Sequence, residues 1–284
     1  MSNSKLPLSR EEFTLLRDYI HTECGIVIGD EKSYLIESHL TRLVMESGCD
    51  CFKDFYLKAK NDQTNKLRMK IVDAMTTNET LWFRDVRPWT VVREIVIPKF
   101  IDELRTGKRN HISVWSAASS TGQEVYSFCM LLDEALRREP VVKKAQFHIL
   151  ATDISPSALY MAISGRYNSI AMSRGMLEGY RERYFKEVDG VSEIIPEIKK
   201  MVVFKQFNLQ NDFANIPHCD LIFCRNVAIY FSPEFKTILL KKMFHKLNAD
   251  GYFFMGGTEN LIGHSADFEQ LEYQRSIYYK PKKN

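Results

Sequence analysis

From about residue 89 to the end of the chain, short apolar runs alternate with longer amphipathic segments. Five runs are rich in β-branched and aromatic residues and are predicted to be strands: 111–117, 147–153, 201–209, 219–226 and 251–257. Three segments have helical spacing of apolar residues: 124–138, 156–165 and 233–247. The alternation is typical of an α/β fold with a doubly wound, mostly parallel sheet and helices on both faces. A last apolar run at 273–281 is predicted to be an edge strand.

The first part of the chain has a different pattern, without strand signals. Ser9 and Glu12 form a capping box before apolar residues at helical spacing, and Gly48 ends a second helix that follows Asp30. Two more helices are expected at about 52–60 and 65–75. We therefore predict three parts in the order 1–73 (all-α domain), 74–88 (linker) and 89–284 (sheet domain). A small β subdomain is expected at about 186–206, with a hairpin turn at Asp189 and Gly190.

Composition limits the classes of function. The chain has 284 residues and a nearly balanced net charge of +3, so no nucleic-acid partner is predicted. No run approaches the roughly 18 apolar residues of a membrane span, and the N-terminus lacks a signal-peptide pattern, so a cytoplasmic protein without membrane insertion is expected. Its six cysteines are expected to be reduced thiols in that compartment.

No metal site is predicted. Cys49 and Cys51 form a C-x-C pair, but no second pair matches it, so the zinc signal is weak. Four histidines have no ligand spacing and are interpreted as structural: His111, His148, His218 and His245.

Polar residues follow the predicted strands at the positions where each strand ends. The turn SAASSTGQE (116–124) follows the first strand; it has one glycine and lacks the G-x-G-x-x-G dinucleotide pattern. Asp153 ends the second strand, Asn208 and Leu209 follow the third, and Arg225 and Asn226 follow the fourth. Ligands of doubly wound sheets bind at these carboxyl ends, so the pattern predicts a nucleoside site. Asp153 either accepts from ribose hydroxyls or caps the next helix, a role that Ser155 is able to fill instead.

Two further stretches mix amide, hydroxyl, aromatic and arginine side chains without an amphipathic period: TTNETLWFRD (76–85) and CRNVAIYF (224–231). Taken alone, Arg84 is compatible with a surface ion pair to Asp85, and Tyr230 with a half-buried core residue. Glu124 is compatible with a residue that only complements a helix dipole. The three tryptophans, at 82, 89 and 115, are interpreted as packing residues.

Together with the motifs WSAASSTGQEVYS, ATDIS, FNL and GGTENL, these two stretches resemble, in order and spacing, the chemotaxis receptor methyltransferases of the CheR type. The resemblance spans nearly the whole chain. It implies a Rossmann-like class I methyltransferase that transfers a methyl group from S-adenosylmethionine to glutamate side chains, with S-adenosylhomocysteine as product. The implied partner is a protein substrate, the helical cytoplasmic region of a chemoreceptor or related signalling protein.

The resemblance also implies the site residues. The implied cofactor-binding residues are Asn78, Thr80, Arg84, Ala117, Glu124, Asp153, Asn208, Leu209, Arg225 and Asn226. Arg84 and Tyr230 are the matching positions nearest the transferred methyl and are the implied catalytic pair.

The implied chemistry suits these residue types. A glutamate carboxylate has a pKa of about 4.3 in water, so it is already an ionised nucleophile near neutral pH and needs no general base. Arg84 is suited to hold that carboxylate, and Tyr230 to donate a hydrogen bond beside it. Trp82, Phe83, Ile229 and Phe231 are expected to form dry walls that exclude water.

Some positions depart from the family pattern. Ala118 stands where the family has glycine, Gln123 replaces a glutamate, and Val125 replaces a proline. The helix at about 32–47 is less basic than in the family. An alternative interpretation is therefore a non-catalytic S-adenosylmethionine-sensing or interaction module with the same fold. A base methyltransferase is disfavoured, because CRNVAIYF offers no N/D-P-P-Y/F motif.

Overall fold

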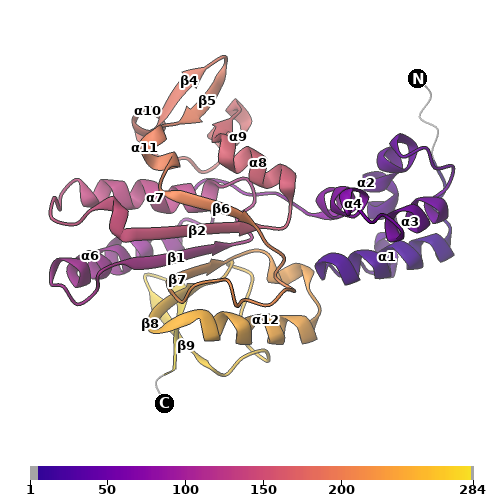
Figure 1. Ribbon diagram of the computed structural model, residues 1–284. Coiled ribbons are helices and arrows are strands. Elements are labelled where there is room, and N and C mark those ends of the chain that lie inside the picture. The colour runs from indigo at the N-terminus through magenta and orange to yellow at the C-terminus, as the bar shows by residue number, and fades with distance from the viewer. Residues whose placement is uncertain (1–5, 283–284) are drawn as a thin grey trace.

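The computed structural model describes residues 6–282, and the part up to residue 75 is helical (Figure 1). Its elements are α1 (Arg10–Cys24), the 3₁₀ turn η1 (Asp30–Lys32), α2 (Ser33–Glu46), α3 (Phe52–Lys60) and α4 (Lys66–Met75). The predicted capping box at Ser9 and Glu12 begins α1. Leu16, Ile36 and Phe55 are fully buried in the apolar core that these helices share.

A helical stretch that the sequence analysis does not predict precedes the first strand. It consists of α5 (Arg87–Val91), the π-helical turn η2 (Val92–Val96) and α6 (Ile97–Arg105). Pro98 has no N–H group to donate to the carbonyl of Glu94, so the regular α-helical bonding pattern is interrupted there. The wider π turn lies at this interruption.

The main sheet has seven strands in the order β6-β2-β1-β7-β8-β10-β9. Their bounds are β1 (Ile112–Ala117), β2 (Phe147–Asp153), β6 (Val202–Gln206), β7 (Cys219–Cys224), β8 (Leu247–Phe254), β9 (Phe268–Tyr273) and β10 (Ser276–Pro281). The pairs from β6 to β8 are parallel, and β10 runs antiparallel to both of its neighbours. Strand order reverses between β1 and β7. The predicted doubly wound, mostly parallel sheet is confirmed.

The predicted edge strand at 273–281 is wrong in its position. Its residues form β10, which lies between β8 and β9 rather than at the edge. The edge is β9, which is mostly exposed or half-buried and pairs with β10 across a turn at Gln274 and Arg275. The apolar run 276–281 is buried because it has a strand on each side.

Helices cover both faces of the sheet (Figure 1). The long ones are α7 (Gln123–Leu136), α8 (Pro156–Ser164) and α12 (Pro233–Lys246). Val114 of β1 packs in the same core as Phe128 of α7, whereas its neighbour Trp115 packs with Leu239 of α12 on the opposite face. Successive side chains of a strand point to opposite faces, and here both faces are covered by helices, so every residue of β1 is buried.

A second, small sheet has the order β3-β5-β4. It comprises β3 (Arg166–Tyr167), β4 (Phe185–Val188) and β5 (Val191–Ile194), accompanied by α9 (Ser169–Ser173), α10 (Tyr180–Tyr184) and α11 (Pro196–Lys199). The turn at Asp189 and Gly190 has positive φ at both residues, 52° and 76°, as the predicted hairpin requires. The predicted subdomain range 186–206 is wrong at its end, because residues 202–206 form β6 of the main sheet, where they pair with β2.

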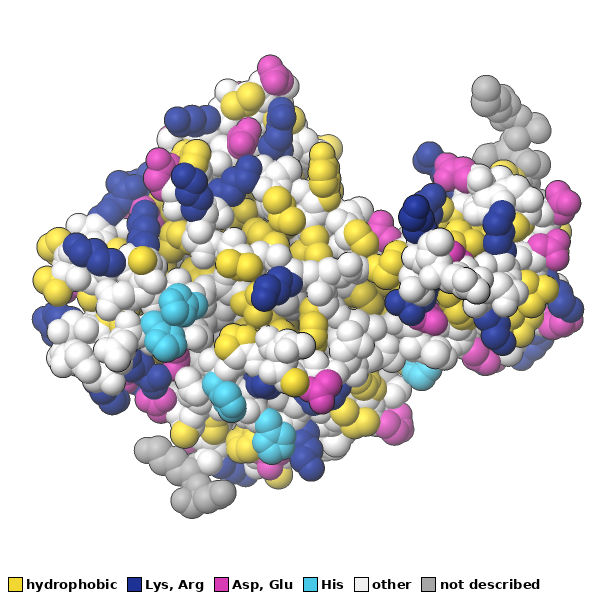
Figure 2. Space-filling view, viewed as in Figure 1, with side chains coloured by type: hydrophobic (Ala, Val, Ile, Leu, Met, Phe, Trp, Pro, Cys, Tyr) yellow, Lys and Arg dark blue, Asp and Glu magenta, His cyan; other side chains and the backbone are white. Residues whose placement is uncertain are grey.

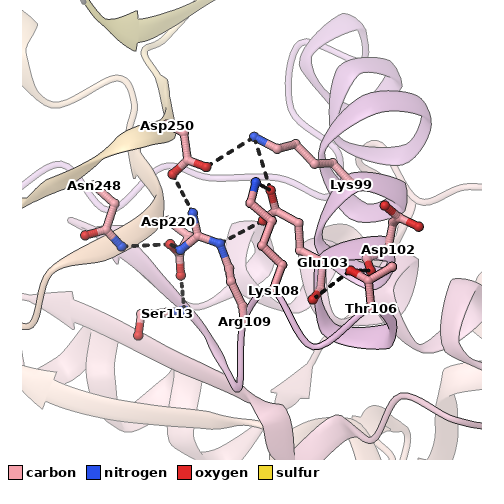
Figure 3. A network of polar contacts seen from close by, with 10 residues as sticks. All are labelled: Lys99, Asp102, Glu103, Thr106, Lys108, Arg109, Ser113, Asp220, Asn248 and Asp250. Atoms are coloured by element: carbon pink, nitrogen blue, oxygen red, sulfur yellow. Dashed lines mark hydrogen bonds and ion pairs between the residues drawn. The ribbon is translucent and has the colours of Figure 1, made fainter.

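An ion-pair network closes the amino ends of the central strands (Figure 3). Arg109 pairs with Glu103, Asp220 and Asp250. Asp220 also accepts a hydrogen bond from the backbone N–H of Ser113, at 2.8 Å, which ties the start of β7 to β1. Glu103 and Asp220 are almost fully buried, so their charges depend on these partners.

The surface carries both signs of charge, with Lys and Arg interspersed among Asp and Glu on the visible face (Figure 2). Within residues 6–282, none of the helices is long and apolar enough to cross a bilayer. Over the same residues, no group of three or more His, Cys, Asp or Glu side chains is placed to hold a metal ion. His111 and His148 stack on each other with ring centroids 4.8 Å apart.

Candidate active site

The carboxyl ends of β1, β2, β6 and β7 face a cleft of about 900 Å³ that is partly continuous with solvent. The linker and the end of α1 complete its walls. Ten of the sequence-predicted residues line it: Asn78, Thr80, Arg84, Glu124, Asp153, Asn208, Leu209, Arg225, Asn226 and Tyr230.

Ala117 is the predicted site residue that does not line the cleft. It is the last residue of β1, is fully buried, and packs in the core on the α12 side. Its neighbour Ala118 lines the cleft instead, together with Ser119 and Ser120. The strand therefore ends one residue before the chain reaches the cleft.

The side chain of Arg225 is 1% exposed and lies between two carboxylates. Its Nη1 donates to Glu124 Oε2 at 2.8 Å, and its Nη2 donates to Asp85 Oδ2 at 2.7 Å. The same Nη2 also donates to the carbonyl oxygen of Arg84 at 2.9 Å. The alternative interpretation of a surface ion pair between Arg84 and Asp85 is thus wrong, because the partner of Asp85 is Arg225.

Arg84 is half-buried and is one of the residues that line the cleft. Nη1 donates to the carbonyl of Glu79 at 2.9 Å. The carbonyl of Arg84 accepts from both Trp89 Nε1 and Arg225. The backbone of Arg84 is therefore held by the core, while several of its guanidinium N–H groups remain for a ligand.

Tyr230 lies in the short 3₁₀ helix η4 (Ala228–Tyr230) and is also half-buried. It packs against the core on the α12 side and lines the cleft, so the two interpretations of this residue are compatible. Its carbonyl accepts from the N–H of Val27 at 2.9 Å. That bond ties the loop after β7 to the segment that follows α1.

Left-handed backbone conformations gather around the cleft. Ala118, Ser120 and Asn226 have φ of 58°, 50° and 57°. In the linker, Asp85 has φ of 69°, and Val86 has φ of 52° with ψ of −57°. The N–H of Arg87 donates to the carbonyl of Asp85, so Val86 is the centre of a γ-turn of the rarer hand. Such strained residues concentrate at functional sites.

Asp153 fixes the loop after β1. Its Oδ2 accepts from the N–H of Ser120 at 2.7 Å, and its Oδ1 accepts from the N–H of Ser155 at 2.9 Å. Burial raises the pKa of Asp153, and the backbone N–H groups offset part of this effect. Ser155 caps α8 through a bond from the N–H of Ala158. Asp153 is therefore available to the cleft and is not needed as the helix cap.

Asn208 connects the cleft to the helical domain. Its Nδ2 donates to the carbonyl of Glu23 at 2.8 Å, and its Oδ1 accepts from the N–H of Gln210. Gln210 in turn donates to the carbonyl of His21. Asn208 gives the carbonyl of Glu23, at the end of α1, a partner that the helix does not supply, whereas the carbonyl of His21 also accepts from the N–H of Gly25. The side chain of Asn208 is thus used for domain contact.

The predicted dry walls are partly wrong. Trp82 and Phe83 are buried in the main core, where they pack on Tyr167 and Trp89 and do not line the cleft. Ile229 is 47% exposed. Phe231 lines the cleft as expected, and the other apolar wall residues include Cys24, Ile26, Ile154, Phe207 and Val227. Burial raises the pKa of the Cys24 thiol to about 11, so this wall is uncharged near neutral pH.

Sequence reasoning does not find Cys24 and Ile26, because nothing local indicates that the end of α1 meets the strand ends. It also does not single out Ser119. The only available signal is the small-residue turn 116–124, which predicts close approach of backbone rather than a particular side chain.

Two buried polar atoms in the cleft wall have no hydrogen-bond partner within the described residues. They are Ser119 Oγ and Arg225 Nε. Buried polar groups are nearly always paired in folded proteins, and a ligand with polar groups in this cleft is able to supply the missing partners. With the carboxylates of Asp153 and Glu124 nearby in the lining, the donor set fits a ligand that carries both hydroxyl and charged groups.

Comparison with known proteins places the chain in a family. Residues 78–277 match the family model described as "CheR methyltransferase, SAM binding domain", and residues 11–76 match "CheR methyltransferase, all-alpha domain". A chemotaxis protein methyltransferase of Vibrio anguillarum is 40% identical over 278 residues, which cover 98% of this chain and 99% of that protein. Chemotaxis protein methyltransferase 1 of Pseudomonas aeruginosa is 38% identical, with 95% of this chain and 98% of that protein covered.

Proposed function

This chain belongs to the CheR methyltransferase family, and from that premise we propose that it methylates glutamate side chains of a chemoreceptor or related signalling protein. The observation that carries the proposal is the position of Arg84 and Tyr230. Both are half-buried, and both line the cleft that also holds the polar residues of four strand ends. We therefore infer that an acceptor site lies beside a cofactor site in this cleft.

The cofactor of the family is S-adenosylmethionine. When bound, it supplies a methyl group whose bond to sulfur breaks as a bond to the glutamate oxygen forms, and S-adenosylhomocysteine leaves with the electron pair. We assign its binding to Asn78, Thr80, Arg84, Glu124, Asp153, Asn208, Leu209, Arg225 and Asn226. Asp153 is the last residue of β2, a position at which an acid accepts from ribose hydroxyls in doubly wound folds.

Ser119 Oγ and Arg225 Nε are the unpaired donors that support this assignment. Asn208 is proposed to contact the cofactor through its backbone, since both ends of its side-chain amide are already bonded within the protein. The fixed charges near Arg225 favour a cationic ligand, because the guanidinium is outnumbered by the carboxylates of Glu124 and Asp85.

Arg84 and Tyr230 orient the acceptor. A guanidinium binds a carboxylate in planar geometry, and the phenol of Tyr230 donates a hydrogen bond to the same group. Correct orientation is the main contribution that this reaction requires from the protein, since the carboxylate is already ionised near neutral pH. The apolar wall of Ile26, Phe207 and Phe231 limits access of water.

The acceptor is proposed to be a helical receptor segment, although α2 offers it little positive charge. Arg42 is paired with Glu46 on that helix. Between residues 53 and 70, some of the basic side chains also form ion pairs. Lys53 pairs with Glu11, and Arg68 pairs with Glu23. Recognition is therefore proposed to rest on contacts at the cleft more than on a cationic face of α2.

The test is transfer of labelled methyl groups from S-adenosylmethionine to proteins in an extract of the source organism. A glutamate methyl ester releases its label as methanol in base. We expect Arg84→Ala to lower base-labile transfer about 100-fold or more while the far-ultraviolet circular dichroism stays unchanged. Arg87→Ala is the matched control, because Arg87 is an exposed arginine three residues further on.

The alternative of a non-catalytic module predicts different results. A module would bind S-adenosylmethionine or its product in calorimetry, yet would give no base-labile label with any acceptor. If the wild type transfers methyl groups and Arg84→Ala transfers them equally well, the role of Arg84 is contradicted, but the proposed methyltransferase activity is not. Absence of both binding and transfer would contradict the proposal as a whole.

A further inference from the structure

A carboxylate outside the predicted site joins the two loops beside the cleft. After β8 the chain makes a turn in which the N–H of Glu259 donates to the carbonyl of Gly256 at 2.9 Å. The side chain of Glu259 folds back over this turn. Its Oε2 accepts from the N–H of Asn226 at 2.7 Å and of Gly256 at 2.8 Å, and its Oε1 accepts from the N–H of Ile229 at 3.2 Å.

Two of these three donors belong to the loop that carries Arg225, Asn226 and Tyr230. The sheet cannot satisfy them, because β7 ends at Cys224. Asn226 is left-handed with φ of 57°, which points its N–H away from the strand ladder. A carboxylate is a suitable substitute partner, since bonds from N–H groups to an ionised acceptor are stronger than those to a neutral one.

The contact between the loops is close. A Cβ atom added to Gly256 would lie 2.6 Å from Asn226 Nδ2 and 2.7 Å from Glu259 Oε2. Asp85 approaches the same loop from the linker, where its Oδ2 accepts from the N–H of Gly257 at 3.3 Å. The loop after β8 thus braces both the linker and the loop after β7.

We propose that Glu259 is a positioning residue for methyl transfer, an inference that rests on the proposed function. It sets the loop at 225–230 so that Asn226 and Tyr230 line the cleft together. Its two oxygens have separate tasks: Oε2 holds the Asn226 end, which belongs to the cofactor site, and Oε1 holds the Ile229 end, next to Tyr230.

Glu259→Gln separates the two tasks. The glutamine oxygen is expected to keep the position of Oε2, where two N–H groups need an acceptor, and its NH₂ group then faces the N–H of Ile229. We expect kcat for methyl transfer to fall about tenfold or more, because the N–H of Ile229, next to Tyr230, loses its acceptor. The Kd for S-adenosylhomocysteine is expected to change less than about threefold. Glu259→Ala removes both acceptors and is expected to weaken S-adenosylhomocysteine binding about tenfold as well.

Glu269→Gln is the matched control, since Glu269 is exposed on the edge strand β9. A purely structural role for Glu259 would lower the folded fraction without separating kcat from Kd, so the split between the two variants is the decisive readout. The inference is overturned if Glu259→Gln keeps the wild-type kcat, or if Glu259→Ala binds S-adenosylhomocysteine as the wild type does. The calorimetric arm needs no acceptor, so it tests Glu259 even if wild-type transfer is absent and the proposed function fails.

Discussion

Asp85 pairs with Arg225 at 2.7 Å, although Arg84 is its neighbour in the chain. The pair ties the linker to the loop after β7, and Asp85 also accepts from the N–H of Gly257. Arg225 then holds the carbonyl of Arg84. A single carboxylate thus helps to fix the backbone of the proposed catalytic arginine without a contact between the two side chains.

Asp85→Asn is expected to weaken both the fold and the site. Arg225 would keep Glu124 as its only charged partner, and its buried guanidinium would be less well compensated. Because the side chain of Asp85 is 35% exposed, solvent screens part of the interaction, and we expect a loss of only about 1 kcal/mol in the free energy of unfolding. Urea unfolding measures this loss, and calorimetry should show weaker S-adenosylhomocysteine binding.

Glu46→Gln serves as the control for Asp85→Asn. It breaks the exposed pair with Arg42, so neither stability nor binding should change measurably. If both variants have the same free energy of unfolding and the same affinity for S-adenosylhomocysteine, the pair of Asp85 and Arg225 stabilises neither the fold nor the site.

Ala118→Gly is expected to stabilise the protein. Ala118 has φ of 58°, a left-handed conformation that costs an L-residue about 1 kcal/mol and glycine almost nothing. The gain should be smaller, about 0.5 kcal/mol, since glycine also adds entropy to the unfolded chain. Because Ala118 lines the cleft, S-adenosylhomocysteine should bind at least as tightly. Thermal unfolding with and without the product tests both effects, and a loss of stability would contradict the assignment of strain to this residue.

Sequence periodicity predicts most of the fold, because burial on both faces of the sheet requires continuous apolar strands and amphipathic helices. It does not place β10 between β8 and β9, since strand order depends on pairing between segments, not on local pattern. It also misses the helical stretch 87–105, where Pro98 and the π turn disturb the period.

The site is predictable where a residue follows a strand and is not predictable where a distant segment supplies it. Asp153, Arg225 and Asn226 lie where the strand ends predict them. Cys24 and Ile26 reach the cleft because the last turn of α1 docks on Asn208 and Gln210 and because Val27 bonds to the Tyr230 carbonyl. Trp82 and Phe83 lie in the core, where their backbone N–H groups donate to the Arg174 carbonyl and to Ser127 Oγ, distant partners that no local aromatic pattern indicates.

Arg109→Met is expected to destabilise the protein by about 3 kcal/mol, because Glu103 and Asp220 would lose a charged partner while remaining buried. The network lies at the amino ends of the strands (Figure 3), and none of the residues drawn there lines the cleft. Binding of S-adenosylhomocysteine to the folded fraction should therefore be unchanged. Urea unfolding and calorimetry measure the two quantities, and a selective loss of binding would contradict the purely structural role of the network.

The same network predicts how stability depends on pH. Burial alone would raise the pKa of Glu103, but hydrogen bonds from Lys108 and Arg109 outweigh it, and the net pKa is lowered. For Asp250, burial is likewise outweighed by Arg109, and its pKa is also lowered. A carboxylate with a lowered pKa stabilises the fold above its unfolded pKa, and this contribution disappears as the pH falls through the folded pKa.

We therefore expect the free energy of unfolding of the wild type to be steady near neutral pH and to fall below about pH 4.5. Arg109→Met should start lower and fall less steeply, since its carboxylates have lost a partner that lowers their pKa. The gap between the two proteins should narrow as the pH is taken down from 5 towards 3. Urea titrations at several pH values measure the gap, and a gap that stays constant with pH would mean that Arg109 stabilises the protein through packing instead of charge.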